Sequence, residues 1–195
     1  FNLIIWNNSD QPDNELIKDV KYDFPIKVVG DQNNNIGGIG RFKAASTLDD
    51  NTKVIFIDDD QNFDENMIIT FLSRYEPNTV KSWWAWKFKN NVSYYQREKI
   101  TVNNENCHYC GTGGMIINSS VFKNEKLFDI PVKYQFIEDL WLSFFCNHYL
   151  GYELKHINNN IEIEEDGKDQ YKKLISLKSD FLKYLTTELK WIIQI

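Results

Sequence analysis

Cysteine is scarce in this sequence, which has three, at positions 107, 110 and 146. An odd number of cysteines cannot complete a framework of disulfides, and the close pair Cys107 and Cys110 lacks the second pair that a four-ligand zinc site needs. We therefore expect reduced thiols, which are typical of a cytoplasmic protein.

The sequence also lacks any run of about 18 apolar residues, the length that a membrane-spanning helix requires. Its start, FNLIIWNNSD, does not place a basic region ahead of an apolar stretch, as a secretory signal would. A mean hydropathy of -0.49 excludes a mostly membrane-embedded protein. We expect a soluble protein with no membrane span in this chain, and the absence of an initiator Met leaves room for a segment upstream of Phe1.

Basic residues are fewer than acidic residues in this sequence. The chain has 22 Lys and Arg residues against 28 Asp and Glu residues, a formal net charge of -6. Such a surface repels a phosphate backbone, so we do not expect nucleic acid as a partner. An anionic substrate would need local help from a metal ion or from a few placed cations.

What the sequence does contain is enough apolar material for one core. Its 195 residues, 42% of them hydrophobic, fit a single domain spanning 1–195. Short apolar runs closed by turn residues predict strands at 3–6, 26–29, 54–57, 79–86, 113–117 and 152–157. Helical spacing predicts a short helix at most within 12–19, a helix opening in the Gly-rich turn 37–40, and helices at 64–75, 138–150 and 169–193. This alternation predicts a three-layer α/β/α sandwich with a mainly parallel central sheet, whose ligands bind at the carboxyl ends of the strands.

That geometry draws attention to the acidic triplet Asp58, Asp59 and Asp60, which directly follows the apolar strand at 54–57. Asp58 and Asp60 are two residues apart, so they project to one side and repel each other unless a cation joins them. A hard divalent ion bound by carboxylate oxygens resolves the repulsion and can bridge two phosphates of a nucleotide. The alternative is an acidic surface turn, since a bare DxD pattern is common.

An EF-hand calcium loop is another possibility, because its first ligands have the alternate spacing that is seen in Asp58, Asp60, Asn62 and Asp64. Its sixth position should be glycine and is Phe63, and its twelfth should be a bidentate Glu and is Ile69. The calcium loop is therefore excluded.

Other segments carry candidate binding or catalytic groups. Glu138 and Asp139 open the helix at 138–150, where acids either favour the helix dipole or face a ligand as a base. The run 111–114, with Gly113 and Gly114, lets backbone approach a ligand or simply makes a tight turn. Arg41, near a helix start, either meets a diphosphate or is an exposed helix cation.

Two further features stay open between function and packing. Trp83, Trp84 and Trp86 suit stacking on sugar faces, but alternate aromatics on a strand more often form core. The polar stretch 89–106 predicts a long loop, mobile without ligand and ordered with it.

Four segments together resemble GT-A glycosyltransferases, especially exostosin-like enzymes and related virus-encoded ones. The segments are VIFIDDD, the upstream NNNIGGIGRFKAA, the downstream CGTGGMI and the helix-opening IEDLWLSFF, and the resemblance covers roughly residues 3–157. A GT-A domain begins with a strand and a helix that build much of the base pocket, and this chain starts at the second strand. The resemblance thus implies that such a unit is lacking or lies upstream.

The resemblance implies a metal-dependent nucleotide-sugar glycosyltransferase, with a UDP-sugar as donor and a glycan or glycoprotein as acceptor. It implies that Asp58, Asp59 and Asp60 hold Mn²⁺ or Mg²⁺ and contact the donor, and that Asp139, with Glu138, acts on the acceptor side. A late histidine completes the metal shell in several GT-A enzymes, which implies that role for His156.

Two alternative functions stay open. A metal-dependent phosphohydrolase would use Asp58 as nucleophile, although its usual DxDxT loop has Asn62 in the last place. A non-catalytic carbohydrate-binding module would bind saccharides through the aromatic residues without a metal.

Overall fold

The computed structural model describes residues 1–9, 12–18, 21, 23–30, 34–164 and 174–195. Its strands are β1 (Leu3–Asn7), β2 (Ile26–Gly30), β3 (Lys53–Phe56), β4 (Gln61–Phe63), β5 (Thr79–Ser82), β6 (Ala85–Phe88), β7 (Arg97–Lys99), β8 (Tyr109–Cys110), β9 (Met115–Asn118), β10 (Glu153–His156) and β11 (Ile161–Ile163). Its helices are α1 (Asp13–Leu16), α2 (Ile39–Ser46), α3 (Met67–Ser73), α4 (Glu138–Phe144) and α5 (Ile175–Thr187), the 3₁₀ turns η1 (Ser119–Lys123), η2 (Glu125–Phe128) and η3 (Val132–Tyr134), and the π-helical turn η4 (Phe145–Tyr149).

A four-stranded sheet in the order β10-β5-β9-β3 forms the centre of the molecule. β10 pairs with β5 in parallel, whereas β9 is antiparallel to both β5 and β3. β3, β5 and β10 therefore run in one direction and β9 runs against them. The predicted α/β class is confirmed, but this sheet is mixed rather than simply parallel.

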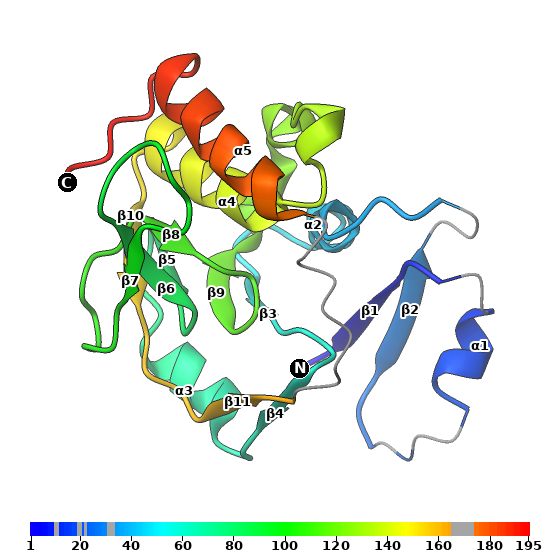
Figure 1. Cartoon of the computed structure of the whole chain (residues 1–195). Helices are drawn as coiled ribbons and strands as arrows, with labels where there is room; N and C mark the ends of the chain where they lie inside the picture. The colour runs from blue at the N-terminus through cyan, green and yellow to red at the C-terminus, as the bar shows by residue number, and fades with distance from the viewer. Residues whose placement is uncertain (10–11, 19–20, 22, 31–33, 165–173) are drawn as a thin grey trace.

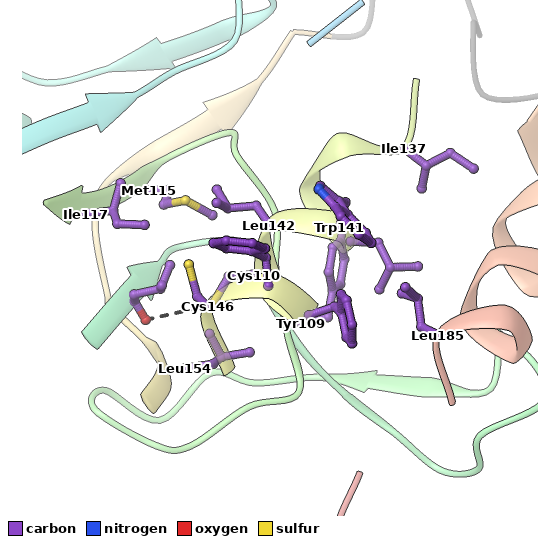
Figure 2. Packing of buried hydrophobic residues seen from close by; sticks show 14 of the residues in the cluster. Tyr109, Cys110, Met115, Ile117, Ile137, Trp141, Leu142, Cys146, Leu154 and Leu185 are labelled. Carbon is purple, nitrogen blue, oxygen red and sulfur yellow. Dashed lines mark hydrogen bonds between the residues drawn. The ribbon is translucent and has the colours of Figure 1, made fainter. Parts of the chain in front are cut away.

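Apolar side chains of β9 pack on both faces of that sheet, because successive strand residues point to opposite sides. Met115 and Ile117 belong to the larger core cluster, together with Leu142 of α4, and Ile116 belongs to a smaller cluster with Phe71 of α3. Helices thus cover both faces, α4 and α5 on one and α3 on the other (Figure 1). Figure 2 shows the larger cluster closely packed around Trp141 and Tyr109.

β1 and β2 form a separate parallel pair, which lies to one side of the central sheet in Figure 1. α2 packs against β1 through a close approach: a Cβ added to Gly40 would lie 2.0 Å from Nε1 of Trp6. The Gly-rich turn predicted to open a helix does so, and its glycine at position 40 makes room for an indole ring.

The predicted strand at 79–86 is wrong as a single element. It divides into β5 and β6, which belong to different sheets. The break falls at Trp83 and Trp84, where the Trp84 N–H donates to Oγ of Ser82 at 3.0 Å instead of continuing the ladder.

The predicted irregular loop at 89–106 is also only partly right. Residues Arg97–Lys99 form β7, which pairs with β6, and Tyr94 and Ile100 are buried in the core. The stretch therefore holds one short strand and two buried side chains, and its predicted mobility without ligand stays a prediction.

Two helix predictions change in detail. The helix predicted at 138–150 begins at Glu138 but turns π-helical from Phe145, and Gly151 follows with a φ of +68°, in the left-handed region that ends helices. The helix predicted at 169–193 corresponds to α5, which ends at Thr187; residues 169–173 lie outside the described part of the chain. In that described part, no helix is both long enough and apolar enough to cross a membrane.

Candidate functional site

The acidic triplet begins two residues beyond β3, at the end of a strand in the central sheet, as the sequence predicts. Asp58 is fixed from two directions: its Oδ1 accepts from Nη1 of Arg41 at 2.7 Å, and its N–H donates to Oε1 of Gln61 at 3.0 Å. Asp59 is exposed, and the backbone oxygen of Asp60 accepts from the N–H of Glu164 at 2.7 Å. The turn is therefore tied to α2 and to the end of β11.

Gly113 lies directly behind Asp58. A Cβ added to Gly113 would lie 2.5 Å from Oδ2 of Asp58 and 2.8 Å from Nε2 of Gln61, so only glycine lets the carboxylate occupy this place. Gly114, with a φ of +78°, donates its N–H to the oxygen of Phe56 at 3.0 Å. Both glycines shape the acidic turn, and their predicted contact with a cofactor stays a prediction.

Arg41 connects the acidic turn to the start of α4. Its side chain and that of Asp58 are 28% and 29% exposed, so the ion pair faces the solvent in part. Burial lowers the pKa of Arg41, but the carboxylates of Asp58 and Glu138 outweigh burial and hold that pKa above its ordinary value. The guanidinium group thus stays charged between carboxylates from two different elements.

Glu138 is the buried member of the predicted acidic pair, with 8% of its surface exposed. Its carboxylate lies at the start of α2, where a Cβ added to Gly38 would be 1.6 Å from Oε1. Burial raises the pKa of Glu138 to about 7, with Arg41 opposing that rise and Asp139 adding to it. Glu138 can therefore change its charge near neutral pH.

Asp139, its neighbour, is held by two donors. Its Oδ1 accepts from the N–H of Leu140 at 2.7 Å, and its Oδ2 accepts from the hydroxyl of Tyr109 on β8. Burial, followed by the charge of Asp139, raises the pKa of Tyr109 well above its ordinary value. Tyr109 therefore remains a hydroxyl donor, and it fixes the orientation of the Asp139 carboxylate.

Several residues that the sequence did not single out surround this pair. The guanidinium carbon of Arg97 lies 3.8 Å from the ring centre of Tyr94 and 4.3 Å from that of Trp86. Nζ of Lys178, on α5, lies 5.2 Å from the ring centre of Tyr94 and is buried. Burial lowers the pKa of Lys178, and Asp139 raises it in opposition. Within this cluster, only Trp86 was a candidate from the sequence.

Other candidates stand apart from the acidic turn. His156 ends β10, which β5 and β9 separate from β3, so about 14 Å of sheet lies between those strands. Its Nε2 lies 2.7 Å from Oδ1 of Asn158. Within the described ranges, no three His, Cys, Asp or Glu side chains are grouped to hold a metal ion. The metal role of His156 stays a prediction that the strand order does not favour.

The three tryptophans form a partly buried row. The rings of Trp83 and Trp84 are 5.4 Å apart between centroids, and Nζ of Lys99 lies 4.6 Å and 4.5 Å above them. A Cβ added to Gly111 would meet Trp84 at 2.6 Å, so the indole packs on the glycine turn. Packing accounts for the row, and saccharide stacking on it stays a prediction.

Comparison with known proteins gives little further guidance. No protein-family model matches the chain, and no curated protein matches it. Solved structures similar to it include the inositol-1-phosphate CTP transferase from T. maritima, with 16% sequence identity, a TM-score of 0.48, and coverage of 92% of this chain and 75% of that chain. A likeness of this size supports no conclusion about chemistry.

Proposed function

We propose that the chain is a metal-dependent transferase that moves a sugar from a nucleotide diphosphate donor, with UDP as the nucleotide, to a hydroxyl group of a glycan or glycoprotein. One observation carries the proposal. Arg41, Asp58 and the acidic pair Glu138 and Asp139 come from three separate elements and meet in one electrostatically coupled group. A cation and carboxylates arranged around a strand end suit a diphosphate on one side and a hydroxyl acceptor on the other.

The acidic turn fits a divalent cation in one respect. Asp58, Asp59 and Asp60 offer carboxylate oxygens, the ligands that Mg²⁺ and Mn²⁺ take, and such ions are often held by one or two carboxylates plus substrate phosphates. We expect Asp58 and Asp60 to hold the ion once a diphosphate supplies further oxygens. When bound, the ion would offset the negative charge of the departing diphosphate.

The residues of the chain then have distinct tasks. Arg41 presents a positive charge beside the acidic turn and can pair with a phosphate oxygen. Asp139, oriented by Tyr109, accepts the proton of the acceptor hydroxyl. A bond forms between the acceptor oxygen and the sugar carbon while the bond from that carbon to the diphosphate breaks, and the diphosphate leaves with the electron pair.

The test is ligand-dependent melting of the full chain. We expect UDP and UDP-sugars to raise the melting temperature with Mn²⁺ present and to lose most of that effect in EDTA, because a ligand that prefers the folded state stabilises it by mass action. The panel should include nucleoside triphosphates and simple phosphate esters. Stabilisation by triphosphates alone would indicate nucleotidyl transfer, and hydrolysis of a simple ester without sugar transfer would indicate a phosphohydrolase.

A second assay identifies the reaction. It uses the UDP-sugar that raises the melting temperature and measures release of UDP with and without candidate saccharides. Saccharide binding that EDTA does not change, with no nucleotide effect, would contradict the proposal and support a carbohydrate-binding module instead.

A further inference from the structure

The thiols of Cys107 and Cys110 form a close pair beside the candidate site. Their Sγ atoms are 3.4 Å apart, and both cysteines are free. Bonded sulfur atoms in a disulfide are about 2.0 Å apart, so these sulfur atoms must come about 1.4 Å closer for a bond to form. The proposed sugar transfer makes no use of this pair.

Both cysteines are buried, and only Cys107 keeps a small exposed surface. Cys107 is 7% exposed, whereas Cys110 is fully buried. Burial, together with the neighbouring Cys107, raises the pKa of Cys110 well above its ordinary value. Because the thiolate is the reactive form, an external reagent meets Cys107 first. Cys110 needs no access to solvent, since its reaction partner is the neighbouring sulfur.

We propose that Cys107 and Cys110 are a modification site, a dithiol that a small-molecule disulfide such as oxidised glutathione converts to an intramolecular disulfide. The Cys107 thiolate attacks one sulfur of the reagent, the reagent's S–S bond breaks, and one small thiol leaves. Cys110 then gives up its proton and attacks the Cys107 sulfur of the mixed disulfide, and the second small thiol leaves. Two protein thiols are oxidised, one small disulfide is reduced, and the two protons end on the released thiols.

Closure of this pair acts on the residues that hold Asp139. Tyr109, which donates to Asp139, lies between the two cysteines in the sequence. The Cys110 N–H donates to Oγ of Ser143 at 3.0 Å, and that hydroxyl lies 2.9 Å from the backbone oxygen of Asp139. A shift of β8 on oxidation would therefore be passed to the Asp139 carboxylate through Tyr109 and to the Asp139 backbone through Ser143. This inference rests on these contacts and does not depend on the proposed sugar transfer.

The experiment treats the folded full chain with oxidised glutathione, then counts thiols and measures intact mass. We expect the wild type to fall from three free thiols to one, to lose two hydrogen atoms in mass, and to carry no glutathione. Peptide mapping should place the new disulfide between Cys107 and Cys110. Cys146, a third buried cysteine that lies in the same core (Figure 2), supplies the matched control, because Cys146→Ser should close the pair as the wild type does.

The single variants test the order of the steps. Cys110→Ser should accumulate glutathione on Cys107, since the thiol that displaces it is gone, and Cys107→Ser should react far more slowly. A wild type that keeps all its thiols would overturn the proposal, as would a lasting glutathione adduct or a disulfide between Cys110 and Cys146. The mapping of the wild type decides these outcomes even if a variant fails to fold.

A separate measurement tests whether the disulfide affects Asp139. The carboxyl ¹³C signal of Asp139, assigned with Asp139→Asn, should shift on oxidation of the wild type and stay unchanged when Cys110→Ser is treated and then freed of its adduct. An unchanged signal in the oxidised wild type would remove the link between the dithiol and the acidic pair.

Discussion

Gly38 and Glu138 lie so close together that the carboxylate fills the place of a side chain on the glycine. A Cβ on Gly38 would be 1.6 Å from Oε1 of Glu138, which is itself only 8% exposed. Gly38 precedes α2 and Glu138 opens α4, so this contact joins the helix that carries Arg41 to the helix that carries Asp139.

Gly38→Ala should therefore lower the free energy of unfolding by about 1–3 kcal/mol, the usual cost of overfilling a packed site. The control is the same change in a Glu138→Ala background. The φ of position 38 is -68°, which alanine adopts readily, so there the change should be neutral or stabilise by about 0.4–1 kcal/mol. Urea denaturation of the four proteins measures the coupling, and equal effects in both backgrounds would contradict the close contact.

Asp60→Asn should abolish Mn²⁺-dependent binding of UDP while leaving the fold intact, because the ion loses a charged ligand at a partly exposed turn. Titration calorimetry with UDP and Mn²⁺ measures the binding, and circular dichroism checks the fold. Asn62→Ala, an exposed change in the following strand, is the matched control and should bind as the wild type does. Equal affinity in Asp60→Asn would show that the metal role of the triplet is wrong.

Asp139→Asn keeps the size of the side chain and removes its basicity. If Asp139 accepts the acceptor proton, sugar transfer should fall by roughly a hundredfold or more, with donor binding little changed. The helix should lose only a few tenths to about 1 kcal/mol. Transfer and melting are measured on one preparation, and near-normal transfer with a lowered melting temperature would assign Asp139 a structural task alone.

Glu138 should make the stability of the protein depend on pH. Its pKa rises from 4.5 to about 7 on burial, so the folded state binds this proton more tightly than the unfolded state does. The stabilisation that comes from the protonated carboxyl is complete below pH 4.5 and is lost as the pH rises to about 7, on the order of 3 kcal/mol in total.

Glu138→Gln removes that dependence. The variant should therefore gain stability relative to the wild type as the pH rises through this window. Urea denaturation from pH 4.5 to pH 8 supplies the measurement. A constant difference between the two proteins would mean that Glu138 ionises as an exposed carboxyl does.

Tyr94→Ala should destabilise the protein by about 3–5 kcal/mol, as loss of a large buried aromatic ring does. Tyr94 is 2% exposed and packs against Phe88, Tyr109 and Arg97. The exposed neighbouring Tyr95→Ala change is the control and should cost far less. Similar small effects of both changes on urea denaturation would contradict the buried packing of Tyr94 and favour the predicted mobile loop.

The spacing of apolar residues predicted those helices and strands that depend only on residues close together in the sequence. The apolar run that precedes Asp58 formed β3, and the acidic opening of the helix at Glu138 was placed at the right residue. Pattern failed where long-range partners decide the outcome. The aromatic run at 79–86 reads as one strand, yet its two halves pair with different strands, because hydrogen bonds to Ser82 and Gly114 turn the chain between them.

The sequence by itself therefore determined the α/β class, the acidic turn after a buried strand and the acidic pair at a helix start, since each follows from periodicity over a few residues. Only the tertiary structure decided that Arg41 pairs with Asp58, 17 residues away, and that Tyr109 holds Asp139, 30 residues away. It also separated His156 from the acidic turn by the order of the strands. Such contacts depend on which chain segments are brought together when the core buries its apolar surface. The spacing of residues along the chain does not predict these long-range contacts.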